Sequence, residues 1–174
     1  MRVLLILLLI LFNPDLKEKR EVIVTKKVIT VSGQTSIGGF NCDYAKNGLK
    51  DTLYIDYDDL KKELIFDIPV QDFSCGNFLL NRDFRKTIKA EQFPTAKVKV
   101  RNLQSNYGHY TCDLSVDLVG KTLHFPALVL KRTPAGVSGN LILSFEELAL
   151  ETPKKMGGLI KVEEALHLEI QLGF

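Results

Sequence analysis

The stretch His109–Leu118, which reads HYTCDLSVDL, decides the fold. Apolar and polar residues alternate along it, so that one face of the segment is dry and the other is wet. This period of two indicates a half-buried β-strand. Short links of turn-forming residues flank it, Asn106-Tyr107-Gly108 before and Val119-Gly120-Lys121 after, as β-hairpins require. The stretch therefore predicts one strand of an antiparallel sheet with a single solvated face.

The same alternation recurs on both sides of this strand. It is clear in Leu64–Val70, Thr95–Arg101 and Leu166–Leu172. Less regular strands are predicted at Val22–Val31, Gly39–Tyr44, Thr52–Asp56, Leu123–Lys131 and Val137–Phe145. Eight or nine short strands in about 150 residues predict a closed barrel or a sandwich.

One segment lacks the alternating pattern of the strands. Leu80, Phe84 and Ile88 are spaced four residues apart, which predicts a short helix over Asn81–Ala90 with one apolar stripe. Phe93-Pro94 ends this segment. A single amphipathic helix packed on a β-barrel is the architecture that follows.

The N-terminus carries a different signal. Of the residues Met1–Phe12, all but Arg2 are apolar, and the run is too short to cross a bilayer. A basic residue followed by such a run is typical of a secretory signal, although no small-x-small cleavage site follows. The alternative is a buried N-terminal strand or helix. We expect residues 1–20 to be a signal-like segment and spacer, and residues 21–174 to form one domain.

Composition and motifs exclude several classes of function. Twenty-three basic residues face 21 acidic ones, for a net charge of +2, without the excess expected of a protein that binds nucleic acid through its phosphates. Phosphate-binding loops, dinucleotide-binding glycines and hydrolase motifs are absent from the sequence. His109, His124 and His167 lack the spacing of zinc ligands and are interpreted as strand histidines in solvent. We therefore predict no catalytic residue, no metal and no cofactor.

The three cysteines differ in their surroundings. An oxidising compartment would permit a bridge between Cys42 and Cys75. Cys112 lies in phase with Tyr110 and Leu114, which indicates a small buried residue. A nucleophilic role for Cys112 would need a nearby base and is the less favoured alternative.

Four stretches, in this order, resemble the YceI-like family. They are Val31-x-Gly33-x-Thr35-Ser36-Ile37-Gly38-Gly39-Phe40-x-Cys42; Phe73-x-Cys75-Gly76-Asn77 with Leu80–Ala90 and Gln92-Phe93-Pro94-x-Ala96-x-Val98; Leu114–Lys121; and Pro153–Val162. The resemblance covers roughly Val22 to Phe174. The last stretch is similar to the C-terminal loop of family members that have paired cysteines.

This resemblance implies a lipocalin-like antiparallel β-barrel of about eight strands with one helix inserted between strands. It also implies an exported protein of the bacterial periplasm that holds a long isoprenoid or a similar lipid, with Cys42 and Cys75 forming the bridge of the paired-cysteine branch. The sequence departs from the family in having no Trp and in carrying Phe145-Glu146-Glu147-Leu148 where typical members have Asp-(Phe/Trp)-Gly. This departure concerns the identity of the ligand more than the fold.

The predicted function is binding of a long-chain lipid or isoprenoid inside the barrel, without catalysis. An eight-stranded barrel has room for one slender ligand. The inward apolar positions are the candidate ligand-binding residues; a filled core is the alternative role for most of them. They are Leu64, Phe66, Ile68, Val98, Val100, Leu114, Val116, Leu118, Leu123, Phe125, Leu141, Leu143, Leu168 and Ile170. The alternative function is a structural barrel with a filled core that binds another protein through its surface.

A basic face on the predicted helix suggests a second binding surface, outside the barrel. Its members are Arg82, Arg85, Lys86 and Lys89. A solvated helix face is the simpler interpretation. The sharper interpretation is a patch that meets an anionic lipid headgroup or a membrane surface.

Overall fold

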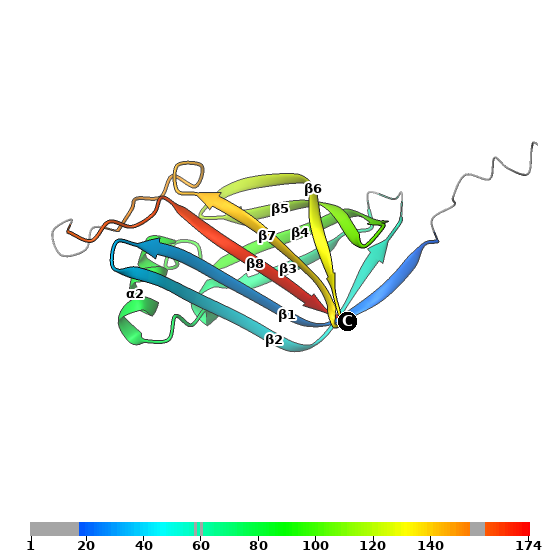
Figure 1. The fold of residues 1–174 in the computed structure, drawn as a ribbon, viewed down its shortest axis with the longest axis horizontal. Coiled ribbons are helices and arrows are strands. Elements are labelled where there is room, and N and C mark those ends of the chain that lie inside the picture. The colour runs from blue at the N-terminus through cyan, green and yellow to red at the C-terminus, as the bar shows by residue number, and fades with distance from the viewer. Residues whose placement is uncertain (1–17, 58, 60, 154–158) are drawn as a thin grey trace, which may run out of the picture.

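A computed structural model describes residues 18–57, 59, 61–153 and 159–174. The predicted export signal falls on residues outside this range. Eight strands make up most of the fold (Figure 1). They are β1 (Arg20–Thr35), β2 (Gly38–Ile55), β3 (Leu64–Pro69), β4 (Thr95–Asn106), β5 (His109–Leu118), β6 (Lys121–Thr133), β7 (Gly136–Ser144) and β8 (Ala165–Gly173).

The strands form one antiparallel sheet in the order β2-β1-β8-β7-β6-β5-β4-β3, which curls into a nearly closed barrel. One link between the two edges of the sheet passes through β4, since Asp56 after β2 donates its backbone N–H to Leu103 O of β4 at 2.8 Å. The Asp56 carboxylate also accepts a hydrogen bond from the backbone N–H of Ser105 at 2.7 Å. The predicted fold class, an antiparallel barrel of about eight strands with one short helix, is confirmed.

The strand β2 is longer than its sequence pattern predicts. β2 runs without interruption over Gly38–Ile55, where two separate strands were expected. β2 has a bulge opposite the part of β1 between Val24 and Lys26, where it contains extra residues without a partner in the register. Gly48 lies in this bulge and has a φ of 71°. Glycine adopts this left-handed conformation at no steric cost, so the strand continues where a turn would otherwise form.

The helix α2 spans Phe78–Thr87, so it begins and ends three residues earlier than the predicted range. Asn77 caps it, because its side-chain oxygen accepts a hydrogen bond from the backbone N–H of Leu80 at 2.9 Å. A short 3₁₀ turn, η1 (Val70–Asp72), connects β3 to the segment before the helix. No helix in the described part of the chain is both long and apolar enough to cross a membrane.

The position of α2 gives the two ends of the barrel different characters. The helix lies at the end where the β1–β2 hairpin turns, and the connection from β7 to β8 lies at the same end (Figure 1). We call this end the mouth. The last residue of the chain lies toward the opposite end.

Candidate functional site

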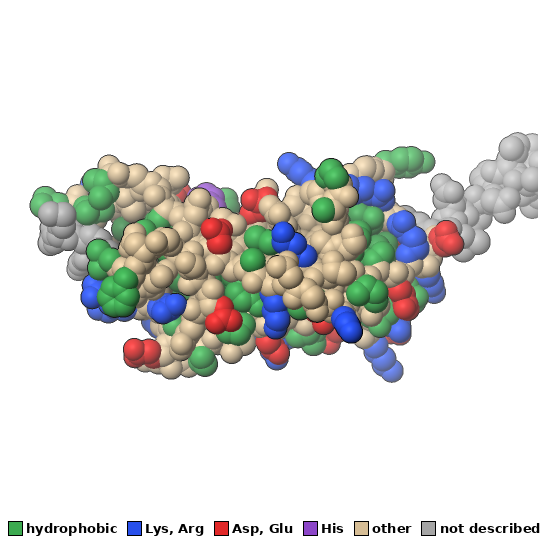
Figure 2. Space-filling model, turned by 90° about the horizontal axis from the view of Figure 1, so that it is seen from below, with side chains coloured by type: hydrophobic (Ala, Val, Ile, Leu, Met, Phe, Trp, Pro, Cys, Tyr) green, Lys and Arg blue, Asp and Glu red, His purple; other side chains and the backbone are tan. Residues whose placement is uncertain are grey.

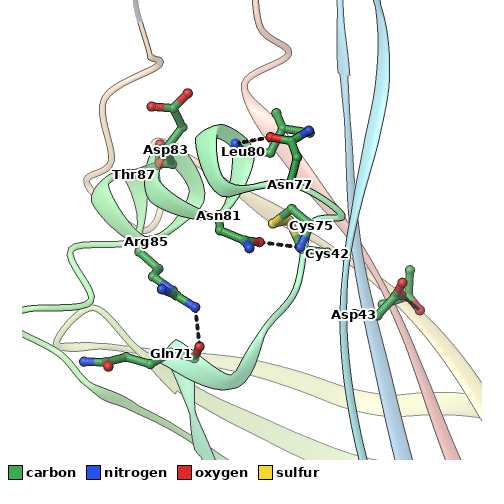
Figure 3. The surroundings of a disulfide bond; sticks show 11 residues. Cys42, Asp43, Gln71, Cys75, Asn77, Leu80, Asn81, Asp83, Arg85 and Thr87 are labelled. Carbon is green, nitrogen blue, oxygen red and sulfur yellow. Dashed lines mark hydrogen bonds between the residues drawn. A yellow bond between two sulfur atoms is a disulfide. The ribbon is translucent and has the colours of Figure 1, made fainter.

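A disulfide holds the segment that leads into α2. Cys42 of β2 is bonded to Cys75 (Figure 3). The backbones of Asp43 and Ser74 beside the bond exchange two hydrogen bonds of 2.9 Å. The backbone N–H of Cys75 also donates to the side-chain oxygen of Asn81 at 2.6 Å. The start of α2 is thereby tied to the barrel wall, and the paired-cysteine prediction for Cys42 and Cys75 is confirmed.

The apolar stripe of α2 forms one wall of a pocket at the mouth. The other walls are the β1–β2 hairpin and the connection between β7 and β8. This mouth pocket has a volume of about 340 Å³, within the usual range for sites that hold small molecules. Its apolar lining residues are Ile37, Phe40, Leu79, Leu80, Phe84, Ile88, Phe145, Ile160, Val162 and Leu166. Asp83 and Thr87 are among the few polar residues on its walls.

The barrel interior is more tightly filled than the mouth. It contains two small voids, which we call the outer void, of about 50 Å³, and the inner void, of about 20 Å³. The outer void shares Phe84, Ile88 and Leu166 with the mouth pocket. It shares Ile29, Ile68, Val98 and Ile170 with the inner void. The three spaces therefore follow one another from the mouth into the barrel, and each shares lining residues with the next.

The predicted interior residues divide between these voids and the solid core. The inner void is lined by Phe66, Ile68, Val98, Val100, Leu114 and Ile170. The outer void is lined by Ile68, Val98, Val116, Leu118, Leu168 and Ile170. The others, which line neither void nor the mouth pocket, are Leu64, Leu123, Phe125, Leu141 and Leu143. All fourteen residues are buried or packed against the core.

The four basic residues of the helix region lie around a second hollow, of about 620 Å³, outside the barrel. Arg85 donates to the backbone oxygen of Gln71 at 2.7 Å, and its Nε is buried without a partner. Lys89 Nζ donates to the backbone oxygen of Ala149 at 3.2 Å. Arg82 and Lys86 are exposed, although Arg82 lies 3.9 Å from the carboxylate of Asp83. Two of the four positive charges are therefore held by backbone carbonyls, and two point to solvent.

Large apolar side chains surround the mouth pocket on the molecular surface. Ile37 is 75% exposed, Phe78 79% and Leu159 80%; Leu79 is also exposed. Figure 2 shows hydrophobic side chains gathered at the end that carries α2, with Lys and Arg side chains next to them. The mouth thus combines an apolar pocket, an apolar rim and a basic flank.

Cysteine and histidine side chains, which elsewhere act as nucleophiles or metal ligands, have other roles in this protein. Cys112 is almost fully buried, and this burial raises the pKa of its thiol to about 12, with the carboxylate of Asp113 adding to the effect. The thiol is therefore protonated at neutral pH and a poor nucleophile. His124 is exposed and hydrogen-bonded to Ser115, and His167 is hydrogen-bonded to Glu163. Within the described residues, no cluster of three His, Cys, Asp or Glu side chains could hold a metal ion.

Two features of the site are missing from the sequence-based prediction. The mouth pocket was not predicted because its walls come from three segments far apart in the chain. Only the helical stripe of Leu80, Phe84 and Ile88 gave a signal for one wall. Lys27, which faces the inner void, was also missed. A register shift in β1 between Val24 and Lys26 places Lys27 in the inward phase of Ile29 and Val31.

Comparison of the sequence with protein-family models finds no match, and neither does comparison with curated proteins. Several solved structures resemble the fold. A polyisoprenoid-binding domain from Saccharophagus degradans has a TM-score of 0.56 at 12% identity, covering 88% of this chain and 95% of that one. BcnA from Burkholderia cenocepacia has a TM-score of 0.55 at 12% identity, covering 83% and 94%. A YceI protein from Campylobacter jejuni has a TM-score of 0.51 at 11% identity, covering 65% and 73%. The chain has the YceI-like fold.

Proposed function

We propose that the protein is an exported, non-enzymatic binding protein that holds the chain of a long lipid or an isoprenoid. The observation that carries the proposal is the apolar mouth pocket, which opens toward solvent at one end and shares walls with the outer void of the barrel at the other. The lipid chain would enter at the mouth and extend between the inward side chains of the barrel. A similar fold in a polyisoprenoid-binding domain supports this ligand class.

The interior residues have a defined part in this proposal. Ile68, Val98 and Ile170 line both voids, so small shifts of these side chains would join the two spaces into one channel. The predicted interior residues that line neither void would then support the channel from behind; they are Leu64, Leu123, Phe125, Leu141 and Leu143. Each methylene group that a ligand buries there contributes about 0.8 kcal/mol to binding.

Export to the bacterial periplasm is part of the same proposal. Disulfides persist in oxidising compartments, and the bond between Cys42 and Cys75 would be stable there. The apolar run at residues 1–12 would supply the signal, and residues 21–174 would remain as the mature domain.

Lipid binding is tested first on purified, export-processed protein. Native mass spectrometry is expected to show a bound species that organic extraction removes, and mass analysis of the extract identifies its chemical class. A protein that carries nothing and fails to bind a fluorescent long-chain lipid would contradict the proposal. The same result would favour the alternative, a barrel that binds another protein through the exposed side chains of Ile37, Phe78 and Leu159.

Blocking the mouth pocket is expected to weaken lipid binding. The Thr87→Phe substitution places an aromatic ring against the pocket wall. A ring there excludes two or more methylene groups of the ligand, so the dissociation constant should rise about tenfold or more. Fluorescence titration with the same long-chain lipid measures this change.

The control for this substitution is Asn140→Phe, which adds the same ring on the exposed face of β7, away from the mouth. It should leave the dissociation constant within about twofold of the wild type. Equal affinities for the Thr87→Phe and wild-type proteins would show that the ligand does not enter through this pocket.

We also propose that the mouth rests on an anionic membrane surface, where a lipid can pass directly into the pocket. Exposed Phe78 and Leu79 would enter the interface, and Arg82, Arg85, Lys86 and Lys89 would face the headgroups. Each basic residue near such a surface contributes about 1 kcal/mol. Arg82 and Lys86, whose side chains are exposed, should contribute most.

The double substitution Arg82→Glu/Lys86→Glu is expected to weaken binding to phosphatidylglycerol vesicles by about 30-fold or more. Co-sedimentation at low and high salt measures the effect, and salt should weaken the wild-type binding as well. A matched control is Lys121→Glu/Lys131→Glu, which reverses two exposed charges on β6. Equal losses in both double variants would mean that net charge, and not the basic flank of the mouth, determines the binding.

A further inference from the structure

Lys27 is a charged residue inside the apolar barrel. It lies on β1 in the same inward phase as Ile29 and Val31, and only 3% of its surface is exposed. Its ammonium group lies 4.2 Å from the centre of the Phe66 ring on β3 and 5.5 Å from the centre of the Tyr44 ring on β2. The side chain lines the inner void together with aliphatic residues such as Ile170.

No carboxylate of the described residues forms an ion pair with Lys27. The charged groups that act on it from the neighbouring strands are Asp51 and Lys46 of β2 and Asp67 of β3, all at longer range. Asp67 is already paired with Lys97 at 3.5 Å. Burial lowers the pKa of Lys27, and its two acidic neighbours offset this effect in part. The ammonium group therefore faces two aromatic rings and has no paired carboxylate among the described residues. Burying a charge is costly unless an anion pairs with it.

The void in front of Lys27 shares walls with the outer void, which in turn shares walls with the mouth pocket. The inner void shares four residues with the outer void, and the outer void shares Phe84 and Ile88 with the mouth pocket. A linear ligand that reaches the inner void would thus place one end at Lys27, while its chain occupies the outer void and its other end lies at the mouth. An anionic group on the inner end would supply the partner that the protein itself lacks.

We propose that Lys27 binds the terminal carboxylate of an acidic long-chain lipid, which enters the barrel with its carboxylate first. One ammonium group balances one negative charge, which fits a carboxylate better than a phosphate monoester with its charge of nearly two. The aromatic rings of Phe66 and Tyr44 exclude water from the pair and so strengthen it. This inference rests on the proposed lipid-binding function and names the ligand class more closely.

The test compares two probes that differ only in the terminal group, oleate and oleyl alcohol, at pH 7. A charged hydrogen bond favours the carboxylate, so the wild-type protein should bind oleate at least about tenfold more tightly than the alcohol. Lys27→Met replaces the ammonium with an uncharged group of similar length and should abolish this preference while retaining affinity for the alcohol. Lys26→Met, on the exposed neighbour, should keep the preference.

A titration with pH tests the same contact in the wild-type protein, whether or not the Lys27→Met variant folds. As the pH rises through the lowered pKa of Lys27, the ammonium loses its proton, so oleate binding should weaken while binding of the alcohol stays constant. Equal affinities for the two probes, or a preference that survives in Lys27→Met, would overturn the carboxylate contact but leave lipid binding intact. If neither probe binds the wild type, the proposed function fails, and the carboxylate contact fails with it.

Discussion

Replacing Cys42 and Cys75 together by alanine is expected to lower the free energy of unfolding by about 4 kcal/mol. The bond joins residues 33 positions apart, and closing a loop of that length removes entropy mainly from the unfolded chain. For a domain of this size, the melting temperature should fall by about 8–15 °C. Urea denaturation of the oxidised wild type and of the double variant, under identical conditions, measures the difference.

Removing the disulfide should also disturb the lipid site, because the bond fixes the segment that leads into α2. Without it, the backbone pair of Asp43 and Ser74 and the Asn81 contact remain to hold the start of the helix. We therefore expect weaker lipid binding together with lower stability. Adding a reductant to the wild type should reproduce both effects.

Cys112→Ala is the matched control, since it removes a buried sulfur that takes part in no disulfide. It should cost about 1 kcal/mol, as other small deletions in a core do. Because it keeps the bond between Cys42 and Cys75, it should lose stability on reduction as the wild type does. If the Cys42→Ala/Cys75→Ala variant were within about 1 kcal/mol of the wild type, the segment before α2 would owe its position to the surrounding contacts and not to the bond.

The strands with strict alternation could be predicted from sequence because residues on the buried face are apolar and residues on the solvated face are polar. β5 shows this well, since Tyr110, Cys112, Leu114 and Val116 all face inward as their phase predicts. The helix was recognised for the same reason, through the spacing of Leu80, Phe84 and Ile88. Its start was predicted too late because the first turn carries exposed Phe78 and Leu79, which do not belong to the stripe.

β-Bulges explain most of the differences between the strands predicted from the alternating pattern and the strands in the structure. A bulge shifts the phase of a strand by one residue, so counting by twos from Val22 and Val24 assigns the inward position to Lys26 in place of Lys27. Asn47-Gly48 in β2 has the composition of a tight turn, yet it lies at the same bulge within a continuous strand. Such shifts depend on the partner strand, which a single segment of sequence does not reveal.

The mouth pocket could not be predicted for a related reason. Residues of one strand share a face by simple periodicity, whereas Ile37, Phe84 and Ile160 are brought together only by the closure of the barrel and by the disulfide. The alternation of apolar residues along the strands therefore predicts ligand binding in the barrel interior alone. The apolar space at the mouth, of about 340 Å³, is much larger than the two voids of the interior, of about 50 and 20 Å³.

Phe84 lies between these two spaces. Its ring lines both the mouth pocket and the outer void, and only 8% of the residue is exposed. It also packs against Phe73, with 5.5 Å between the ring centres, next to the disulfide. The ring thus contributes to the stability of the fold at the point where a lipid chain would have to pass into the barrel.

Phe84→Ala is expected to lower the free energy of unfolding by about 3–5 kcal/mol and, at the same time, to strengthen lipid binding. The cavity left by the ring joins the mouth pocket to the outer void. A ligand that buries two further methylene groups there, at about 0.8 kcal/mol each, should bind about tenfold more tightly. Urea denaturation and fluorescence titration measure the two quantities on the same preparation, with the lipid removed beforehand because bound ligand raises the apparent stability.

Leu53→Ala separates this effect from a general loosening of the barrel. Leu53 is fully buried in β2 and lines none of the three spaces. Its replacement should cost about 2–5 kcal/mol and leave the lipid affinity unchanged. If Phe84→Ala instead bound lipid as weakly as the Thr87→Phe variant, the ring would be part of the binding surface and not the barrier to the interior. The lipid chain would then end in the mouth pocket, and the voids behind Phe84 would be packing defects of a filled core.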